Sequence, residues 1–194
     1  MGLIHITPAG QVRRSSGAGI RERMATRGRV QAVVWGAEME RWLLDDPQRV
    51  FHPKQYRRHV LRIDPWRKNK IVANSVAGFG NGLNLMRDWL AAEVPPPPTH
   101  VAWGTNGTAP QLSDVGLFDE KVRTDIIARA KGDKQVIIGG FMGSTTGNGF
   151  TYQEASLVTG PLASQWRLFA RVAINPIVKS TSVIISVSWQ VDLA

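Results

Sequence analysis

The chain contains no cysteine, and this absence excludes disulfide bonds, thiolate metal sites and a cysteine nucleophile. Long hydrophobic runs are absent as well, since no apolar stretch approaches the roughly 18 residues that a membrane-spanning helix needs. The N-terminal stretch MGLIHITPAGQVRR carries its charges after the apolar positions, which is the reverse of a secretory signal. We therefore expect a soluble, unprocessed protein that is stabilised by packing and by assembly.

Two glycine-rich stretches raise the question of a phosphate site. Residues 104–110 (GTNGTAP) follow an apparent strand, but they lack the lysine and the spacing of GxxxxGK[ST], and no helix N-terminus follows to receive a phosphate. Residues 139–149 (GGFMGSTTGNG) do not match GxGxxG, and no strand-helix-strand unit surrounds them. Both stretches are predicted to be turns or loops, so we expect neither a nucleotide nor any other cofactor.

Motifs for metal binding and catalysis are also missing from the sequence. The four histidines, at positions 5, 52, 59 and 100, show no HExxH or HxH spacing, and two of them stand among Arg and Lys, which oppose a bound cation. No GxSxG nucleophile elbow is present, and nothing selects one Ser/His/Asp triad among the many conceivable ones. We expect no catalytic or metal-binding residues, and hence a protein that is not an enzyme.

The composition is that of a folded protein with an uneven charge distribution. Hydrophobic residues make up 43% of the 194 residues and charged residues 20%, which is ordinary for a globular chain. The net charge is +9: residues 1–94 carry 16 Lys/Arg against 8 Asp/Glu, and residues 95–194 carry 8 against 7. The first half therefore holds nearly all of the excess positive charge, which favours an anionic partner.

The first 94 residues show no clear domain of their own. Residues 1–70 are interpreted as a basic, extended arm followed by an irregular docking segment, because Gly, Ser and Arg dominate the start and prolines interrupt the rest. Within this segment, residues 30–44 fit a short helix, although Val33, Val34 and Trp35 fit a strand nearly as well. Amphipathic spacing predicts a helix at about 82–92, inside the segment 71–94, and the prolines at 95–98 mark a module boundary.

Residues 95–194 show the period of two that is typical of strands. A hairpin is expected around Gly132-Asp133, with further strands at 151–158, 165–174 and 181–191. In the last of these, alternation predicts one buried face of Val, Ile and Trp and one exposed face of Ser and Gln. The fold class is therefore predicted to be mainly β, with an antiparallel β-sandwich or jelly-roll-like C-terminal domain that follows a short helix and the extended basic arm.

Basic and aromatic residues alternate between Arg49 and Lys70, and this is the one pattern with a physical argument for binding. The arginines suit phosphates or carboxylates, while the aromatics suit stacking on bases or packing on a protein. The alternative is that the aromatics anchor the segment to the core or to a neighbouring subunit, with the charges solvated. The candidate partner-binding residues are Arg13, Arg14, Arg21, Arg23, Arg27, Arg29, Arg57, Arg58, Arg62, Trp66 and Arg67.

The order of several short motifs in residues 78–192 resembles a group of small structural proteins of tailed bacteriophages. The resemblance rests on a helix followed by a THIAVGTGTTAP-like segment, an EVxR-like stretch, an EA-containing strand and a closing pair of strands with an ITKT-like turn. The matching positions are 99–109, Ser113-Asp114, 120–123, Glu154-Ala155 and 170–189. This chain differs from the group by its long basic N-terminal segment and by Ser156-Leu157-Val158 in place of Gly-Leu-Phe.

The resemblance implies a virion part with a β-sandwich fold and no catalytic residues, assembled in the host cytoplasm. Its expected partners are other virion proteins of the tail, baseplate or fibre-attachment apparatus and further copies of itself; nucleic acid is left open as a partner but is not favoured, and no membrane is expected. One alternative is a capsid decoration or neck protein whose basic arm contacts the capsid or DNA. The alternative from another class is a carbohydrate-binding domain that recognises a receptor.

Overall fold

The structure is a computed structural model, and it is mainly β. It describes residues 4–6, 12–14, 28–68, 70–71, 75–76, 79–80, 97–111, 113–133, 135–160 and 168–192. The helix predicted at 82–92 lies outside the described residues, as does most of the predicted arm before residue 28. Two short antiparallel pairs stand apart from the main sheet: β1 (Ile4–Ile6) with β2 (Val12–Arg14), and β7 (Ser75–Val76) with β8 (Phe79–Gly80).

Ten strands form the main sheet, and every pairing in it is antiparallel. Their order is β4-β3-β14-β11-β10-β9-β12-β13-β6, with β5 also paired to β3. The bounds are β3 Gly28–Gly36, β4 Val60–Ile63, β5 Arg67–Lys68, β6 Lys70–Ile71, β9 His100–Gly104, β10 Glu120–Gly132, β11 Gln135–Met142, β12 Thr151–Val158, β13 Leu168–Val178 and β14 Val183–Asp192.

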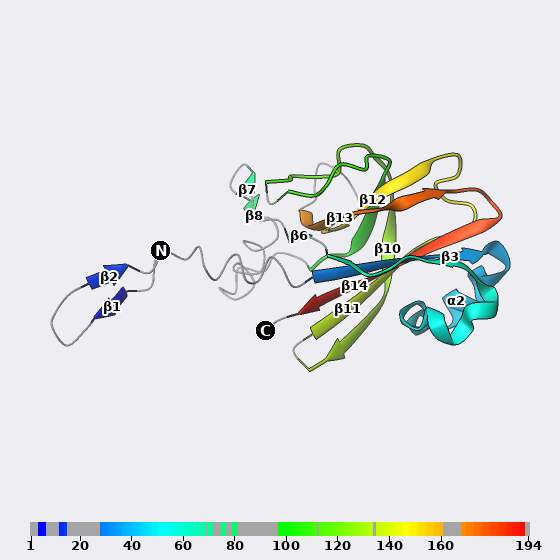
Figure 1. The fold of residues 1–194 in the computed structure, drawn as a ribbon, viewed down its shortest axis with the longest axis horizontal. Coiled ribbons are helices and arrows are strands. Elements are labelled where there is room, and N and C mark those ends of the chain that lie inside the picture. The colour runs from blue at the N-terminus through cyan, green and yellow to red at the C-terminus, as the bar shows by residue number, and fades with distance from the viewer. Residues whose placement is uncertain are drawn as a thin grey trace.

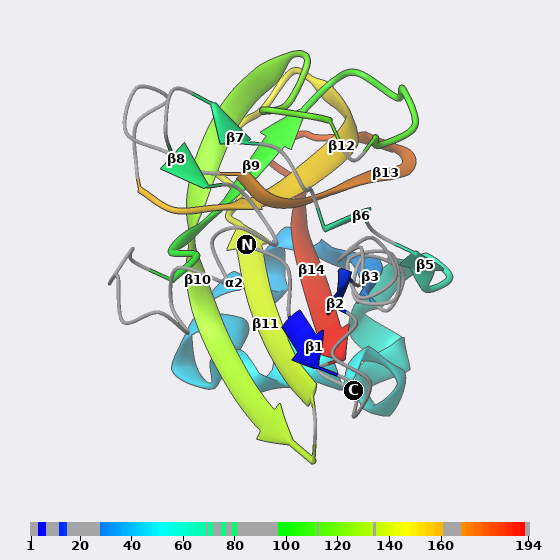
Figure 2. The ribbon, with the colours of Figure 1, turned by 90° about the vertical axis from the view of Figure 1, so that its left-hand side faces the viewer.

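The long strand β10 makes the sheet curl into two facing halves (Figures 1 and 2). Its first part, Glu120 to Asp125, pairs with β9, and its second part, from Ile126 to Gly132, pairs with β11, with an irregularity in each ladder. One half therefore holds β4, β3, β14 and β11, and the other holds β9, β12, β13 and β6. The main core lies between the halves, because it takes buried residues from β3, β11 and β14 as well as from β9, β12 and β13.

The strand predictions for residues 120–191 are confirmed. The hairpin is β10 and β11, with Gly132 opposite Gln135, and residues 151–158 form β12 with the predicted bounds. Of the strand predicted at 165–174, residues 165–167 lie outside the described residues; β13 begins at Leu168 and runs past the predicted end, through Pro176 to Val178. The prediction of an exposed polar face on β14 is wrong, because Ser186 and Ser188 are buried. That face is covered by a layer of short helices, so β14 is buried on both sides.

The covering layer connects β3 to β4 and consists of η1 (Ala37–Met39), α2 (Glu40–Asp45), η2 (Pro47–Phe51) and η3 (Pro53–His59). It packs a second core against the outer face of the sheet, including Leu43 and Val50 from the layer and Trp35 from β3. Polar groups of β14 are satisfied by the layer and by β3: Trp35 Nε1 donates to Ser186 Oγ at 2.9 Å, and Ser188 Oγ donates to the Val50 carbonyl at 3.1 Å.

Glycines in β11 allow both layers to approach this strand closely. A Cβ at Gly139 would lie 2.8 Å from Phe51 Cε1 of the helical layer, and a Cβ at Gly140 would lie 2.2 Å from Val101 Cγ2 on the other side. The prediction of a turn or loop for residues 139–149 is therefore wrong for residues 139–142, which belong to β11 and are glycine-rich for packing. It is confirmed for Gly147 and Gly149, which have positive φ angles of 65° and 87° in the turn before β12.

The assignment of residues 1–70 to an arm and docking segment differs from the structure for residues 28–63. Strand β3 lies between β14 and β4, with nine residue pairs to β14 from Val183↔Gly36 to Val191↔Gly28. Its apolar residues are buried on both faces, with Val34 in the main core and Val33 in the second core. The open choice for residues 30–44 is settled in favour of both structures, a strand to Gly36 and then helical turns.

Candidate partner-binding surface

The predicted binding residues divide into three groups. Arg29, Arg57, Arg58, Arg62, Trp66 and Arg67 lie in the described segment 28–68 and are all exposed. Arg13 and Arg14 lie on β2, whose side chains are not described, and Arg21, Arg23 and Arg27 fall outside the described residues. The later part of the predicted set is therefore exposed on β3, η3, β4, β5 and the segment between β4 and β5, and the arginines before residue 28 stay predictions.

Arg62 and Arg67 are engaged within the protein. Arg62 Nε lies 3.0 Å from Asp64 Oδ1, and its Nη1 donates to the Pro176 carbonyl at 3.1 Å. Arg67 Nη2 donates to Asn175 Oδ1. Both arginines therefore reach from β4 and β5, at one end of the strand order, to β13, which lies next to β6 at the other end.

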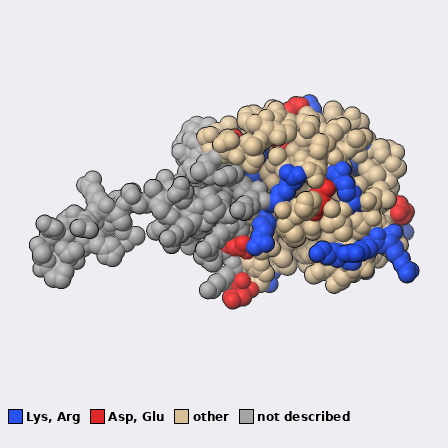
Figure 3. Space-filling model, in the orientation of Figure 1, with Lys and Arg blue, Asp and Glu red and all other residues tan. Residues whose placement is uncertain are grey.

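Arg57, Arg58 and Lys54 are exposed on η3, and the structure records no ion pair for them with any described residue. Figure 3 shows Lys and Arg side chains gathered on this face of the molecule. Two apolar side chains follow η3 in the sequence: Leu61 is 64% exposed and Trp66 is 41% exposed. Leu61 projects because the register between β3 and β4 shifts there, so that it has no partner residue on β3.

The other aromatics of this segment anchor it to the sheet. Phe51 and Tyr56 pack against the second core, and the Tyr56 ring meets Trp42 edge-on with centroids 4.6 Å apart. The Arg49 guanidinium lies over the Trp42 ring at 4.2 Å and donates to the Trp42 carbonyl at 2.5 Å. The anchoring alternative for the aromatics therefore describes Phe51 and Tyr56, while Trp66 stays available at the surface.

Sequence reasoning missed a buried ionic network on the outer face of the other half of the sheet. Arg171 on β13 contacts Glu154 on β12, with Nη2 and Oε2 2.8 Å apart, and both side chains are fully buried. Its Nη1 lies 2.9 Å from Asp114 Oδ2, and its Nη2 also donates to the Thr108 carbonyl at 2.9 Å. Asp114 and Thr108 belong to the loop between β9 and β10, so the network fixes this loop on the sheet.

The Glu154 carboxylate holds the far end of the same loop by accepting hydrogen bonds from the loop's backbone N–H groups. Its Oε1 accepts from Asp119 N at 3.1 Å, and its Oε2 accepts from Phe118 N at 3.5 Å. The Phe118 ring covers Arg171, with the guanidinium carbon 4.5 Å from the ring centroid. The signal that was available in the sequence is a charged residue inside an apolar strand, in TYQEASLV and in LFARVAI. A buried charge needs a partner, and each of these two supplies the other.

The glycine- and threonine-rich loop makes its hydrogen bonds with its own protein. Thr108 N donates to Asn106 Oδ1 at 2.8 Å, which is an Asx turn, and Thr105 Oγ1 donates to Asp119 Oδ2. The Thr105 carbonyl accepts from Gln153 Nε2 at 2.9 Å. Hydrogen bonds from Lys121 and Thr105 hold the pKa of Asp119 below its ordinary value. The interpretation of residues 104–110 as a turn agrees with this arrangement.

A buried lysine organises the turn at residues 144–149. Lys179 is 1% exposed, and its Nζ donates to Asn148 Oδ1 at 2.8 Å and to the Ser180 carbonyl at 2.9 Å. A third, longer contact of 3.5 Å reaches the Ser144 carbonyl. Burial lowers the pKa of Lys179, while the Glu40 carboxylate opposes that shift. Lys179 lies in the turn that matches the ITKT motif of the phage proteins. It stabilises the neighbouring turn at residues 144–149 by donating to the Ser144 carbonyl and to Asn148 Oδ1.

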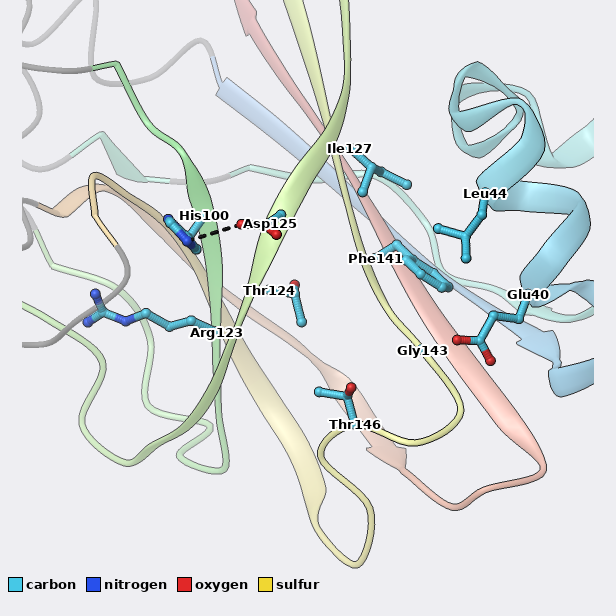
Figure 4. A pocket seen from close by; sticks show the side chains of 10 residues that line it. All are labelled: Glu40, Leu44, His100, Arg123, Thr124, Asp125, Ile127, Phe141, Gly143 and Thr146. Carbon is cyan, nitrogen blue, oxygen red and sulfur yellow. Dashed lines mark ion pairs between the residues drawn. The ribbon is translucent and has the colours of Figure 1, made fainter.

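A groove of about 500 Å³ lies between α2 and strands β9, β10 and β11 (Figure 4). His100 Nε2 lies 3.1 Å from Asp125 Oδ1 in it, and His100 Nδ1 is 2.7 Å from Thr99 Oγ1. Glu40 lines the opposite wall and accepts a hydrogen bond from Ser144 N at 3.0 Å. The partner of His100 comes from the paired strand, which local spacing in the sequence does not reveal. Among the described residues no three potential metal ligands form a cluster.

Comparisons of the chain with protein-family models, with curated proteins and with solved structures give no match. In the part of the chain that the structure describes, no helix is long and apolar enough to cross a membrane.

Proposed function

We propose that this protein is a structural, non-catalytic component of a tailed-bacteriophage virion, in the tail, baseplate or fibre-attachment apparatus. The main support for the proposal is the structural role of three residues that match the phage proteins. Asp114, Glu154 and Arg171, which lie in three separate matching stretches, meet in one buried network. The matching residues therefore stabilise the β-domain by fixing a loop on its sheet. A rigid domain of this kind suits a protein that assembles with others.

The exposed surface supports the same proposal. The polar residues of the motifs are hydrogen-bonded within the domain, so binding to a partner depends on other residues at its surface. Exposed residues there include Arg57, Arg58, Leu61 and Trp66. Arg and Trp are the residue types most enriched where protein partners bind tightly. We propose that this surface, together with the basic segment before residue 28, contacts other virion proteins, and that the β-domain packs against further copies of itself.

The finer fold description is part of the proposal. Two halves of a curled antiparallel sheet enclose one core, and β10 passes from one half to the other. This arrangement supports a β-sandwich related to the jelly roll, in which strands cross between the two sheets through bends and bulges.

Each of the two alternative functions is supported by one specific observation. The excess positive charge of the first half favours a capsid decoration or neck protein, whose basic segment meets the capsid or DNA. The groove in Figure 4 has the carboxylates of Asp125 and Glu40 on opposite walls, and Thr124 and Thr146 also line it. Carboxylates and hydroxyls suit a sugar, and this favours the carbohydrate-binding alternative.

The proposal is tested on particles of the parent phage purified by density gradient. Quantitative mass spectrometry should find this chain in every preparation, at a copy number that is a multiple of the tail symmetry relative to a tail protein. Particles of a nonsense mutant grown in a non-suppressing host should lack the chain and should fail to attach fibres or to adsorb. A chain that remains in the lysate and is absent from intact particles contradicts the proposal.

A further inference from the structure

The surface formed by residues 54–67 has an unusual combination of charge and apolar exposure. It contains five Lys/Arg and one acid, Asp64, which is buried and paired with Arg62. Arg67 is bonded to the neutral Asn175 and so keeps its charge uncompensated, as do Lys54, Arg57 and Arg58. Four positive charges in this segment therefore have no recorded acidic partner in the described chain. Such a surface attracts an anionic partner.

Apolar groups accompany these charges at the edge of the sheet. Leu61 is 64% exposed and Trp66 is 41% exposed, and both lie on the segment that contains β4 and β5. Strand β4 is the last strand on its side of the sheet, and its register shift directs Leu61 outward. Since Asp64 N bonds to the Ala32 carbonyl of β3, the alternation of the antiparallel ladder directs the backbone groups of Ile63 away from β3.

Protein fits this surface better than nucleic acid. Binding of single strands depends on exposed aromatic rings on which bases stack, and two of the three aromatics available between Arg49 and Lys70 are packed against the second core. Leu61 offers nothing to a nucleotide, whereas an exposed leucine beside tryptophan and arginine is suited to bury apolar side chains of a protein. Free backbone groups at a strand edge suit an extended chain that adds to the sheet.

We infer that residues 54–67 bind an extended acidic segment of another protein. Its carboxylates meet Lys54, Arg57 and Arg58, and its apolar side chains cover Leu61 and Trp66. The inference rests on the proposed function for the statement that the partner is a virion protein. The acidic and apolar character of the partner segment is inferred from the charges and exposed apolar side chains of residues 54–67 and does not depend on the proposed function.

Binding is measured with the purified full chain and three labelled probes by fluorescence anisotropy. The probes are a peptide that alternates Glu with Val, a peptide that alternates Glu with Ser, and a single-stranded oligothymidylate. The Glu/Val peptide should bind most tightly. The double substitution Arg57→Glu/Arg58→Glu should weaken it by about tenfold or more, because two attractive contacts become repulsive.

Matched controls separate this surface from the overall positive charge. Arg41→Glu alters an exposed base on α2, and it should change the affinity less than twofold beyond the general charge effect seen with the Glu/Ser peptide. Leu61→Ser should weaken the Glu/Val peptide and leave the Glu/Ser peptide unchanged. Unchanged binding after Arg57→Glu/Arg58→Glu overturns the inference, and so does an oligothymidylate affinity above that of the Glu/Val peptide.

A photo-crosslinking experiment in the particle distinguishes failure of the inference from failure of the proposed function. The photoreactive residue p-benzoylphenylalanine is placed at Leu61 and, as a control, at Val115, which is 47% exposed in the loop before β10. Cross-links from position 61 to an acidic segment of a virion protein support both. A chain present in particles without such cross-links contradicts the inference alone. A chain absent from particles contradicts the proposed function, and the peptide assay then decides the inference.

Discussion

Arg171 and Glu154 face each other on neighbouring strands as an ion pair that is fully buried, with Nη2 and Oε2 2.8 Å apart. Both residues bond to the loop that covers them, Arg171 through Asp114 and the Thr108 carbonyl, and Glu154 through the backbone N–H groups of Phe118 and Asp119. The pair therefore connects the sheet to its outer covering. Removing Glu154 deprives Arg171 of one of its two buried carboxylate partners and leaves it paired with Asp114 alone among the described residues.

We predict that Glu154→Ala destabilises the protein by about 3–5 kcal/mol, the usual cost of breaking a buried ion pair. The measurement is the free energy of unfolding in urea. Limited proteolysis should also cut the loop at 105–119 sooner in the variant than in the parent, because two of its backbone N–H groups lose their acceptor.

Ser156→Ala is the matched control for that substitution. Ser156 lies two residues along the same strand and is fully buried, but its Oγ has no hydrogen-bond partner in the structure. Removing an unsatisfied hydroxyl relieves a desolvation penalty, so the variant should be as stable as the parent or more stable by about 1 kcal/mol. Equal losses in Glu154→Ala and Ser156→Ala contradict the role given to the ion pair.

Gly140→Ala should destabilise the protein by about 1–3 kcal/mol through overpacking, because the new methyl group would lie 2.2 Å from Val101 Cγ2. Val101→Ala in the same chain should relieve the clash, so the double variant should lose less stability than the sum of the single variants. Gly149→Ala provides a contrast, since nothing lies within 4 Å of its Cβ and only its φ of 87° opposes the change. An additive double variant at 140 and 101 contradicts the packing explanation.

Tyr152 should titrate above the ordinary tyrosine value of 10.0, because burial raises its pKa. Stability from this group is complete below pH 10 and is lost as the pH rises through the folded-state pKa, since the unfolded chain gives up its proton first. In Tyr56→Phe, Tyr152 is the one remaining tyrosine, and absorbance at 295 nm reports its ionisation. A midpoint at or below 10 contradicts the burial of the hydroxyl, and Tyr152→Phe should remove the transition.

Most strands of residues 95–194 are predictable from the sequence, because apolar and polar residues alternate along them and turn residues separate them. Residues 151–158 and the hairpin at Gly132 are examples. Strand β3 was ambiguous because Val33 and Val34 are buried on opposite faces, which removes the alternation. The predicted exposure of Ser186 and Ser188 failed for a related reason: a helical layer contributed by residues 37–59 covers them.

The candidate surface was partly predictable and the buried network was not. Local composition indicates Arg57, Arg58 and Trp66 as candidate binding residues, and they are exposed in the structure. The pairing of Glu154 with Arg171 and Asp114 depends on which strands are neighbours and on where a loop returns. Charge and aromatic content along the chain carry no information about such contacts between distant residues. They also did not distinguish Phe51 and Tyr56, which pack on the sheet, from Trp66.

Cryo-electron microscopy of the intact parent particle, with density assigned to this chain, tests the central claim most directly. The account predicts density for the curled sheet in a ring or fibre base on the tail, in several symmetric copies, with residues 54–67 lying against an acidic segment of a neighbouring protein. Density on the capsid shell or neck contradicts the proposed position in the virion. Absence of the chain from the particle contradicts the structural role itself.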